Sequence, residues 1–174
     1  MDCKDLILDG LGRIEEHMHQ YLSGLTPEQL VFRPDPEANS IGWLAWHLTR
    51  VQDDHISDLA GRPQAWLDRG WHARFNRPAT GDDTGFGHTS AQVAALQPPS
   101  AQVLIDYHAA VHQPSVEYVR SLTCDQLDRE LDEPWDPPVT VGVRLISVLD
   151  DCMQHAGQMA YIRGLIEARH WLPY

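Results

Sequence analysis

The chain has 174 residues, which is enough for one ordinary domain with a sizeable core, and its formal net charge is −12. This acidic balance argues against binding to nucleic acid or to an anionic membrane surface, because both partners need a basic footprint. We therefore expect a single domain over residues 1–174 whose partners are small molecules or proteins.

The cysteines and the first residues bear on the cellular compartment. Cys3, Cys124 and Cys152 are odd in number, widely spaced and without a CxxC pair, so the sequence predicts neither a disulfide framework nor a zinc knuckle. The opening residues MDCKDLILDG are acidic rather than basic, and no run of 18 uncharged apolar residues occurs. We expect a soluble protein of the reducing cytoplasm.

The first half of the chain contains two long helical patterns, in which apolar residues recur every three or four positions. The first pattern runs from Ile7 to Leu25, and Thr26 followed by Pro27 predicts the start of a short connecting helix. The second pattern begins at the N-cap residue Ser40 and continues to about residue 61.

Periodicity is lost between residues 62 and 99, where only 64–68 and 90–96 look helical. We expect this long insert to cover part of the core rather than to form a second domain. Its glycine-rich stretch TGDDTGFGHTS lacks the Lys and the spacing of a phosphate-binding loop. We interpret it as a mobile flap near the functional site, in which His88 contacts the substrate or the residues behind it.

A third helical pattern runs from Ser100 to Leu122, and Thr123 begins another short connector. The proline-rich segment EPWDPPVTV then leads into a fourth long helix, from about Val143 to Arg169. No segment has the alternation of a strand. The sequence therefore predicts an all-α protein, an antiparallel four-helix bundle with a long, partly helical connection between the second and third long helices.

Three polar residues occupy positions that should face the core. His155 lies in the apolar stripe of the fourth helix, Asp151 lies one turn before it, and His47 lies in the stripe of the second helix. Residues four apart on a helix are separated by about 40° and 6 Å, so their side chains can bind one cation. Two nitrogen ligands and one oxygen ligand would leave open positions, as in catalytic divalent-metal sites. A buried Asp hydrogen-bonded to a core His explains the same spacing without a metal, and both readings stay open.

Other candidates fit a site less well. His108 and His112 are interpreted as a surface pair, and Cys152 as a thiol that fills the core. His55 lies about 12 Å along the helix from His47, too far to share its metal, and is expected with its acidic neighbours 53 and 54 to rim the site or to face solvent. Trp43, one turn before His47, is expected to wall the pocket and contact the substrate.

The stretches SIGWLAWHLTRVQDDHI and DDCMQHAGQMAYIRGL resemble the DinB-like superfamily of metal-binding four-helix bundles. The WHL around His47 and the HAGQ that begins at His155 are the specific parts of this likeness. The resemblance implies that His47 and His155 are metal ligands. The third ligand in the family is most often His, whereas Asp151 stands here, as in the mycothiol-dependent maleylpyruvate isomerase branch. Zinc is the expected metal, and nickel or iron are alternatives.

The resemblance also implies that the metal activates a low-molecular-weight thiol for attack on an electrophile. Because twelve of the thirteen basic residues are Arg, we interpret the composition as that of a GC-rich, actinobacterial genome, in which mycothiol is the expected thiol. The resulting hypothesis is a mycothiol S-transferase acting in detoxification, with homodimers common among look-alikes. A ferrous oxygen-activating enzyme, a non-enzymatic metal-binding module and a metal-free bundle remain alternatives.

Overall fold

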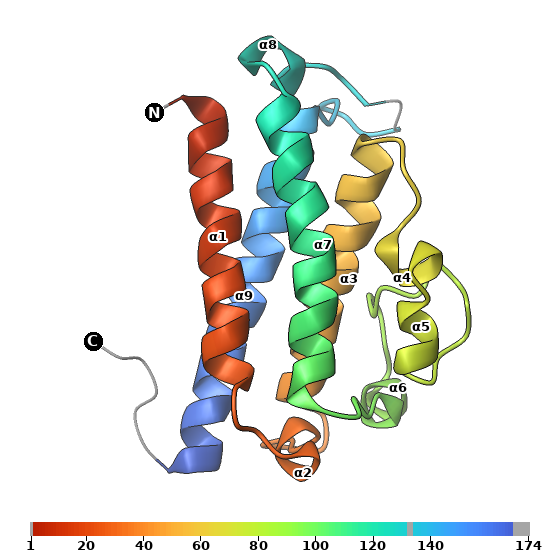
Figure 1. Cartoon of the computed structure of the whole chain (residues 1–174), viewed down its shortest axis with the longest axis vertical. Helices are drawn as coiled ribbons and strands as arrows, with labels where there is room; N and C mark the ends of the chain where they lie inside the picture. Colours follow the sequence, from red (N-terminus) through yellow and green to blue (C-terminus); the bar gives the residue numbers. More distant parts are fainter. Residues whose placement is uncertain (1, 132–133, 169–174) are drawn as a thin grey trace.

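The computed structural model describes residues 2–131 and 134–168. Within them the chain folds into a bundle of long helices joined by shorter ones (Figure 1). The long helices are α1 (Cys3–Leu22), α3 (Ile41–Leu59), α7 (Ala101–Ser121) and α9 (Val141–Glu167), and the short ones are α2 (Pro27–Leu30), α4 (Ala65–Asp68), α5 (Trp71–Arg74), α6 (Ser90–Ala95) and α8 (Cys124–Leu127). Extended pairing in the described residues is limited to an isolated bridge between Glu130 and Thr140. The predicted all-α bundle is confirmed.

Each long helix packs against two others: α3 lies against α9 and α7, and α1 lies against the same two helices. In Figure 1, α1 and α9 run downward while α3 and α7 run upward. The helices α3 and α7 can run in the same direction because the connection from residue 60 to residue 100 returns the chain to the lower end of the bundle before α7 begins. The antiparallel neighbours are therefore α1 with α7 and α3 with α9.

The helix starts follow from local capping chemistry. The Ser40 hydroxyl accepts the backbone N–H of Trp43 at 3.2 Å, and the Thr140 hydroxyl accepts that of Val143 at 3.3 Å. The second long helix thus begins where the sequence predicts, and the fourth begins two residues earlier than predicted. Its predicted end at Arg169 lies outside the described residues. No helix among the described residues is long and apolar enough to cross a membrane.

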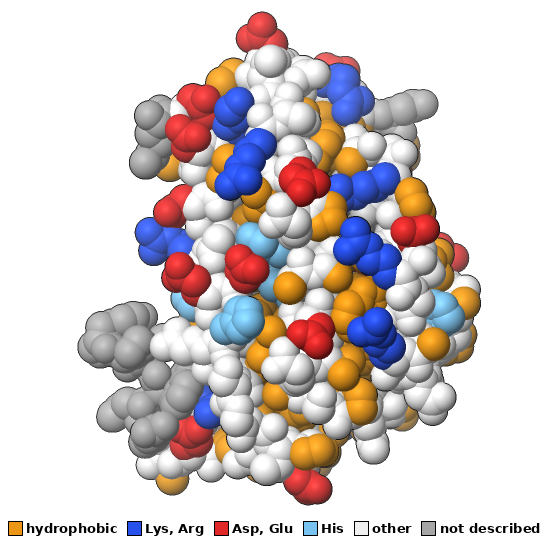
Figure 2. Space-filling model, viewed as in Figure 1, with side chains coloured by type: hydrophobic (Ala, Val, Ile, Leu, Met, Phe, Trp, Pro, Cys, Tyr) orange, Lys and Arg blue, Asp and Glu red, His pale blue; other side chains and the backbone are white. Residues whose placement is uncertain are grey.

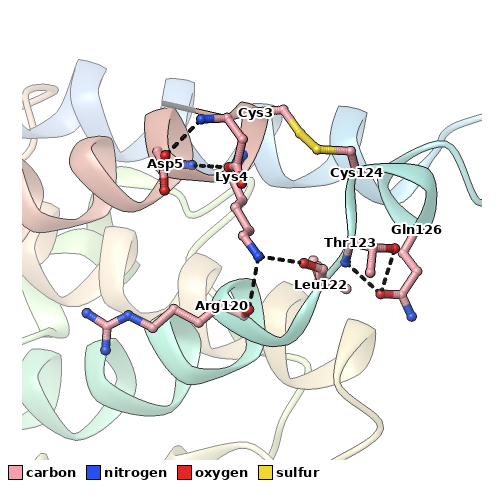
Figure 3. The surroundings of a disulfide bond; sticks show 9 residues. Cys3, Lys4, Asp5, Arg120, Leu122, Thr123, Cys124 and Gln126 are labelled. Atoms are coloured by element: carbon pink, nitrogen blue, oxygen red, sulfur yellow. Dashed lines mark hydrogen bonds between the residues drawn. A yellow bond between two sulfur atoms is a disulfide. The ribbon is translucent and has the colours of Figure 1, made fainter.

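The upper end of α1 is tied to the end of α7 and to α8 (Figure 3). A disulfide joins Cys3 to Cys124 across 121 residues of sequence. Beside it, the Lys4 ammonium donates to the carbonyl oxygens of Arg120 at 3.4 Å and Leu122 at 3.1 Å, which lie at the C-terminal end of α7. The expectation that the cysteines define no disulfide framework is therefore wrong for Cys3 and Cys124, because sequence spacing could not show that the two helix ends meet.

Histidine side chains gather in the middle of the face that α1 and α7 present (Figure 2). On α7, His108 and His112 are only 1% and 8% exposed, so the prediction of a surface pair is wrong. The Thr49 hydroxyl donates to a helix carbonyl and so accepts the Nδ1–H of His108 at 3.2 Å. The His112 Nε2 lies 3.0 Å from a carboxylate oxygen of Glu15 on α1. Both histidines therefore link neighbouring helices inside the bundle.

A buried ion pair on α3 anchors the long connection. Asp53 is 1% exposed and accepts the backbone N–H groups of Ala65 and Trp66, each at 2.8 Å, and the hydroxyl of Tyr107 at 2.9 Å. Its partner Arg50 is fully buried and lies 3.5 Å from it. The expectation that Asp53 rims the site or faces solvent is wrong, because this carboxylate binds the orphan N–H groups at the start of α4.

Replacing Asp53 by Ala should lower the free energy of unfolding by about 3 to 5 kcal/mol, because it leaves the buried charge of Arg50 without its carboxylate partner and two backbone donors without their acceptor. Urea unfolding followed by circular dichroism measures the change. Asp68→Ala, which removes an exposed carboxylate from the same region, should stay within about 0.5 kcal/mol of wild type. Equal losses in the two variants would contradict the anchoring role.

The buried His108 should make stability depend on pH. Burial, and secondarily the nearby His112 and His19, lowers its pKa from 6.5 to about 3. The unfolded chain therefore binds the proton at higher pH than the folded chain does, and stability should fall as the pH drops below about 6.5. Between pH 7 and pH 5 this one residue should remove about 2 kcal/mol. Urea unfolding should show that loss in wild type but not in His108→Gln, which cannot titrate; identical pH profiles would contradict it.

Candidate metal centre

Three side chains predicted from the sequence converge where α3 packs against α9. His47 comes from α3, and Asp151 and His155 come from successive turns of α9. The Oδ1 atom of Asp151 lies 3.8 Å from the Nε2 of His47 and 3.5 Å from the Nε2 of His155. Among the described residues, these three form a group whose possible ligand atoms all lie within 4.8 Å of one another.

The donor set fits a divalent cation. Separations of 3.5 and 3.8 Å are too long for hydrogen bonds. They are close to the spacing of about 3.4 Å between two ligands that each lie about 2.1 Å from a tetrahedral zinc ion. The second carboxylate oxygen of Asp151 is buried and has no hydrogen-bond partner. An unpaired buried carboxylate oxygen is costly, and a cation at this point would stabilise it.

Hydrogen bonds on the far side of each ring fix how the two histidines face the centre. The Nδ1 of His47 lies 2.6 Å from the carbonyl oxygen of Thr84, which can only accept, so this nitrogen carries the hydrogen. The Nδ1 of His155 lies 2.8 Å from the side-chain oxygen of Gln158 and donates in the same way. Both Nε2 atoms therefore present lone pairs toward Asp151, as metal-ligating histidines do.

Charge and burial act differently on the two rings. Burial lowers the pKa of His47, and the bond to Thr84 and the charge of Asp151 only partly oppose it, so this ring is neutral at pH 7. Burial also acts to lower the pKa of His155, but the nearby Asp151 carboxylate and the hydrogen bond to Gln158 outweigh burial, and the net shift is upward. A cation bound at this point would compete with the proton on His155.

Aromatic rings close the inner side of the centre. Trp43 stacks on His47 with ring centroids 4.7 Å apart and meets His155 edge-on at 6.4 Å. The indole N–H of Trp43 donates to the Nδ1 of His88 at 3.1 Å, and the Nε2–H of His88 donates to Asp83 at 2.8 Å. The sequence suggests a substrate contact for His88, but both of its ring nitrogens are engaged in holding the loop to the bundle.

The glycine-rich loop of residues 81–88 lies directly against the centre. Gly85 has a φ of +95°, and a Cβ atom built on it would lie 2.9 Å from both the Nδ1 of His47 and the ring of Trp46. The guanidinium of Arg50 donates to the carbonyl oxygens of Gly81 at 2.7 Å and Asp83 at 3.1 Å. These contacts hold in place the segment that the sequence suggests is a mobile flap.

The remaining candidates lie apart from the centre. Cys152 is fully buried, its thiol donates to the carbonyl of Leu48 at 3.5 Å, and burial raises its pKa well above the usual range. It is therefore an inert core residue, as the sequence predicts. The Nδ1 of His55 lies 3.0 Å from the guanidinium of Arg144 and so lies apart from His47, Asp151 and His155, the triad of the candidate metal centre.

The loop contact yields a test with a matched control. Gly85→Ala should weaken zinc affinity about 10- to 100-fold, because the new methyl group displaces the loop and with it the acceptor of the His47 Nδ1–H. Gly87→Ala carries similar backbone strain, with a φ of +74°, but its methyl group would meet nothing within 4 Å, so its zinc affinity should stay near that of wild type. Competition against a chromophoric chelator measures both. Parallel losses in the two variants would show that strain, not contact with His47, matters.

Comparisons with known proteins identify the fold and the family of the chain. The crystal structure of a conserved protein from Enterococcus faecalis is 32% identical in sequence, with a TM-score of 0.89 over 97% of this chain and 99% of that one. No curated protein matches the chain. The family model described as mycothiol S-transferase matches residues 7–168, nearly the whole length. The chain therefore belongs to the mycothiol S-transferase family, within the DinB-like superfamily.

Proposed function

We propose that this protein is a metal-dependent thiol S-transferase that joins mycothiol to an electrophilic small molecule. The observation that carries the proposal is the convergence of His47, Asp151 and His155 in a chain of this family, together with the buried and unpaired second carboxylate oxygen of Asp151. Membership of the family supports a small-molecule thiol as substrate. The triad supports a metal as the group that activates it.

Zinc is the metal that we propose, with nickel or iron as alternatives. Two imidazole nitrogens and one carboxylate oxygen are a common zinc set in catalytic sites, in which a fourth position is left for a substrate. The carboxylate of Asp151 also offsets one of the two positive charges of such an ion, which a third neutral histidine would not do. The exposed fractions of the side chains, 6% for His47 and 33% for Asp151, leave the Asp151 side open to solvent.

A divalent cation at this position would supply the positive charge that favours the deprotonated form of a thiol at neutral pH. The chain's own residues position that charge: Thr84 and Gln158 hold the two rings, and Trp43 covers the inner face of His47. In the overall reaction the thiol sulfur forms a bond to the electrophilic atom, the leaving group departs with its electron pair, and the thiol proton passes to solvent. No further catalytic base is required. We propose that Trp43 also contacts the substrates.

Detoxification in the cytoplasm is the role that we propose for this reaction, and a homodimer is the assembly that we propose for the protein.

The inert, buried Cys152 supports a mechanism in which the attacking sulfur comes from the co-substrate and not from the protein. The partial exposure of the Asp151 side chain supports access for small electrophiles from outside the bundle.

Metal content and turnover of wild type, His47→Ala and His155→Ala test the proposal together. Wild type should hold about one zinc ion per chain after reconstitution and consume mycothiol with an electrophile panel, and each variant should lose both properties, because each removes one of three ligands. His19→Ala, which removes an exposed histidine from α1, should change neither. A fully metallated wild type that consumes no thiol with any electrophile would contradict the proposal.

The same donor set also suits ferrous iron, since two histidines and one carboxylate are the ligands of many oxygen-activating enzymes. That reading predicts iron in anaerobically purified protein and oxygen uptake with a reductant. A metallated protein without either activity, whose melting temperature falls in the ligand variants, would instead indicate a metal-stabilised binding module. Absence of metal after reconstitution would indicate a metal-free bundle.

A further inference from the structure

A polar cavity of about 470 Å³ lies at the other end of the seam between α3 and α9. Its charged and polar lining comes from the last turns of α3, the first turn of α9 and the segment that leads to α4, and includes Asp54, His55, Asp58, Arg62, Gln64 and Arg144. This volume is in the range of sites that bind small molecules. None of these residues belongs to the triad.

The cavity is aligned with the triad by helix geometry. Asp54 lies seven residues after His47 on α3, and Arg144 lies seven residues before Asp151 on α9. Seven residues are almost two turns, so each pair shares a helix face within about 20° and is separated by about 10 Å along the axis. Because α3 and α9 are antiparallel neighbours, the two offsets point the same way along the seam. A ligand whose reactive end lies at the triad would need to extend about 10 Å to reach the cavity.

Among the described residues, the lining contains two carboxylates, Asp54 and Asp58, and two guanidinium groups, Arg62 and Arg144. Gln64 is held in place by donating to Asp54 at 2.6 Å and by accepting from Arg50 at 3.0 Å. Hydroxyl groups can donate to the carboxylates and accept from the guanidinium groups, so a neutral ligand with many hydroxyl groups can bond to both kinds of side chain.

We propose that this cavity binds the uncharged, polyhydroxylated body of the thiol co-substrate while the thiol end lies at the triad. The inference rests on the proposed function and assigns the specificity for the thiol to residues outside the metal centre. Mycothiol has the required form, a cysteine thiol carried on a sugar and polyol body. Glutathione carries two carboxylates, and the net charge of −12 disfavours its approach.

The decisive probe is S-methylmycothiol, which keeps the body of the ligand but has no thiol to ionise. Isothermal titration should show that wild type binds it and that the double variant Asp54→Asn, Asp58→Asn binds it about tenfold more weakly or worse, because two charge-assisted hydrogen bonds are lost. Asn at position 54 keeps an oxygen for the Gln64 amide, so the cavity wall is preserved. Glutathione should bind the double variant more tightly than wild type.

The matched control is a double variant, Glu16→Gln on α1 and Asp106→Asn on α7, which removes two exposed carboxylates elsewhere. It should bind S-methylmycothiol as wild type does. Turnover of mycothiol in the same preparations separates the two proposals. In one outcome, wild type turns over mycothiol normally while wild type and the Asp54, Asp58 variant bind S-methylmycothiol equally. That result would overturn the proposed role of the cavity and leave the proposed function standing. Neither turnover nor binding in wild type would overturn both.

Discussion

The buried guanidinium of Arg50 is the interaction on which the surroundings of the site depend. It lies one turn beyond His47 on α3, has no solvent exposure, and donates to two carbonyl oxygens of the loop, to Gln64 and to the hydroxyl of Tyr107. A buried cation is costly unless every donor finds a partner, so the loop, α4 and α7 can pack only in the arrangement that supplies those partners. One charge thereby fixes three otherwise separate segments relative to the helix that carries His47.

The contacts of Arg50 affect the candidate metal centre through the loop that they hold. With residues 81 and 83 held by Arg50, the next carbonyl, that of Thr84, meets the Nδ1–H of His47. Gly85 then passes so close to the rings of His47 and Trp46 that a side chain would not fit. His88 completes the arrangement by bridging Trp43 and Asp83. The loop therefore sets the tautomer and the tilt of His47 from behind, while α9 places Asp151 and His155 in front of it.

Much of the architecture could be predicted from the sequence because its causes are local. Apolar spacing placed the long helices, hydroxyl caps such as Ser40 placed their starts, and four-residue spacing brought Asp151 and His155 together, since all three depend only on helix geometry. What was missed depends on partners distant in sequence. Glu15 and Thr49 explain the burial of His112 and His108, and the meeting of two helix ends explains the bond between Cys3 and Cys124. A glycine-rich stretch indicated a loop near the site, but nothing in it pointed to Arg50.

The return of the chain between α3 and α7 has a consequence for how this kind of protein can diversify. Because those two helices point the same way, some forty residues must travel the length of the bundle along its outside, and part of that path lies against His47. Asp151 and His155 both lie on α9, which this connection does not interrupt. Substitutions, insertions and deletions in the connection can therefore reshape the surroundings of the candidate centre while the helices that carry its three side chains stay unchanged.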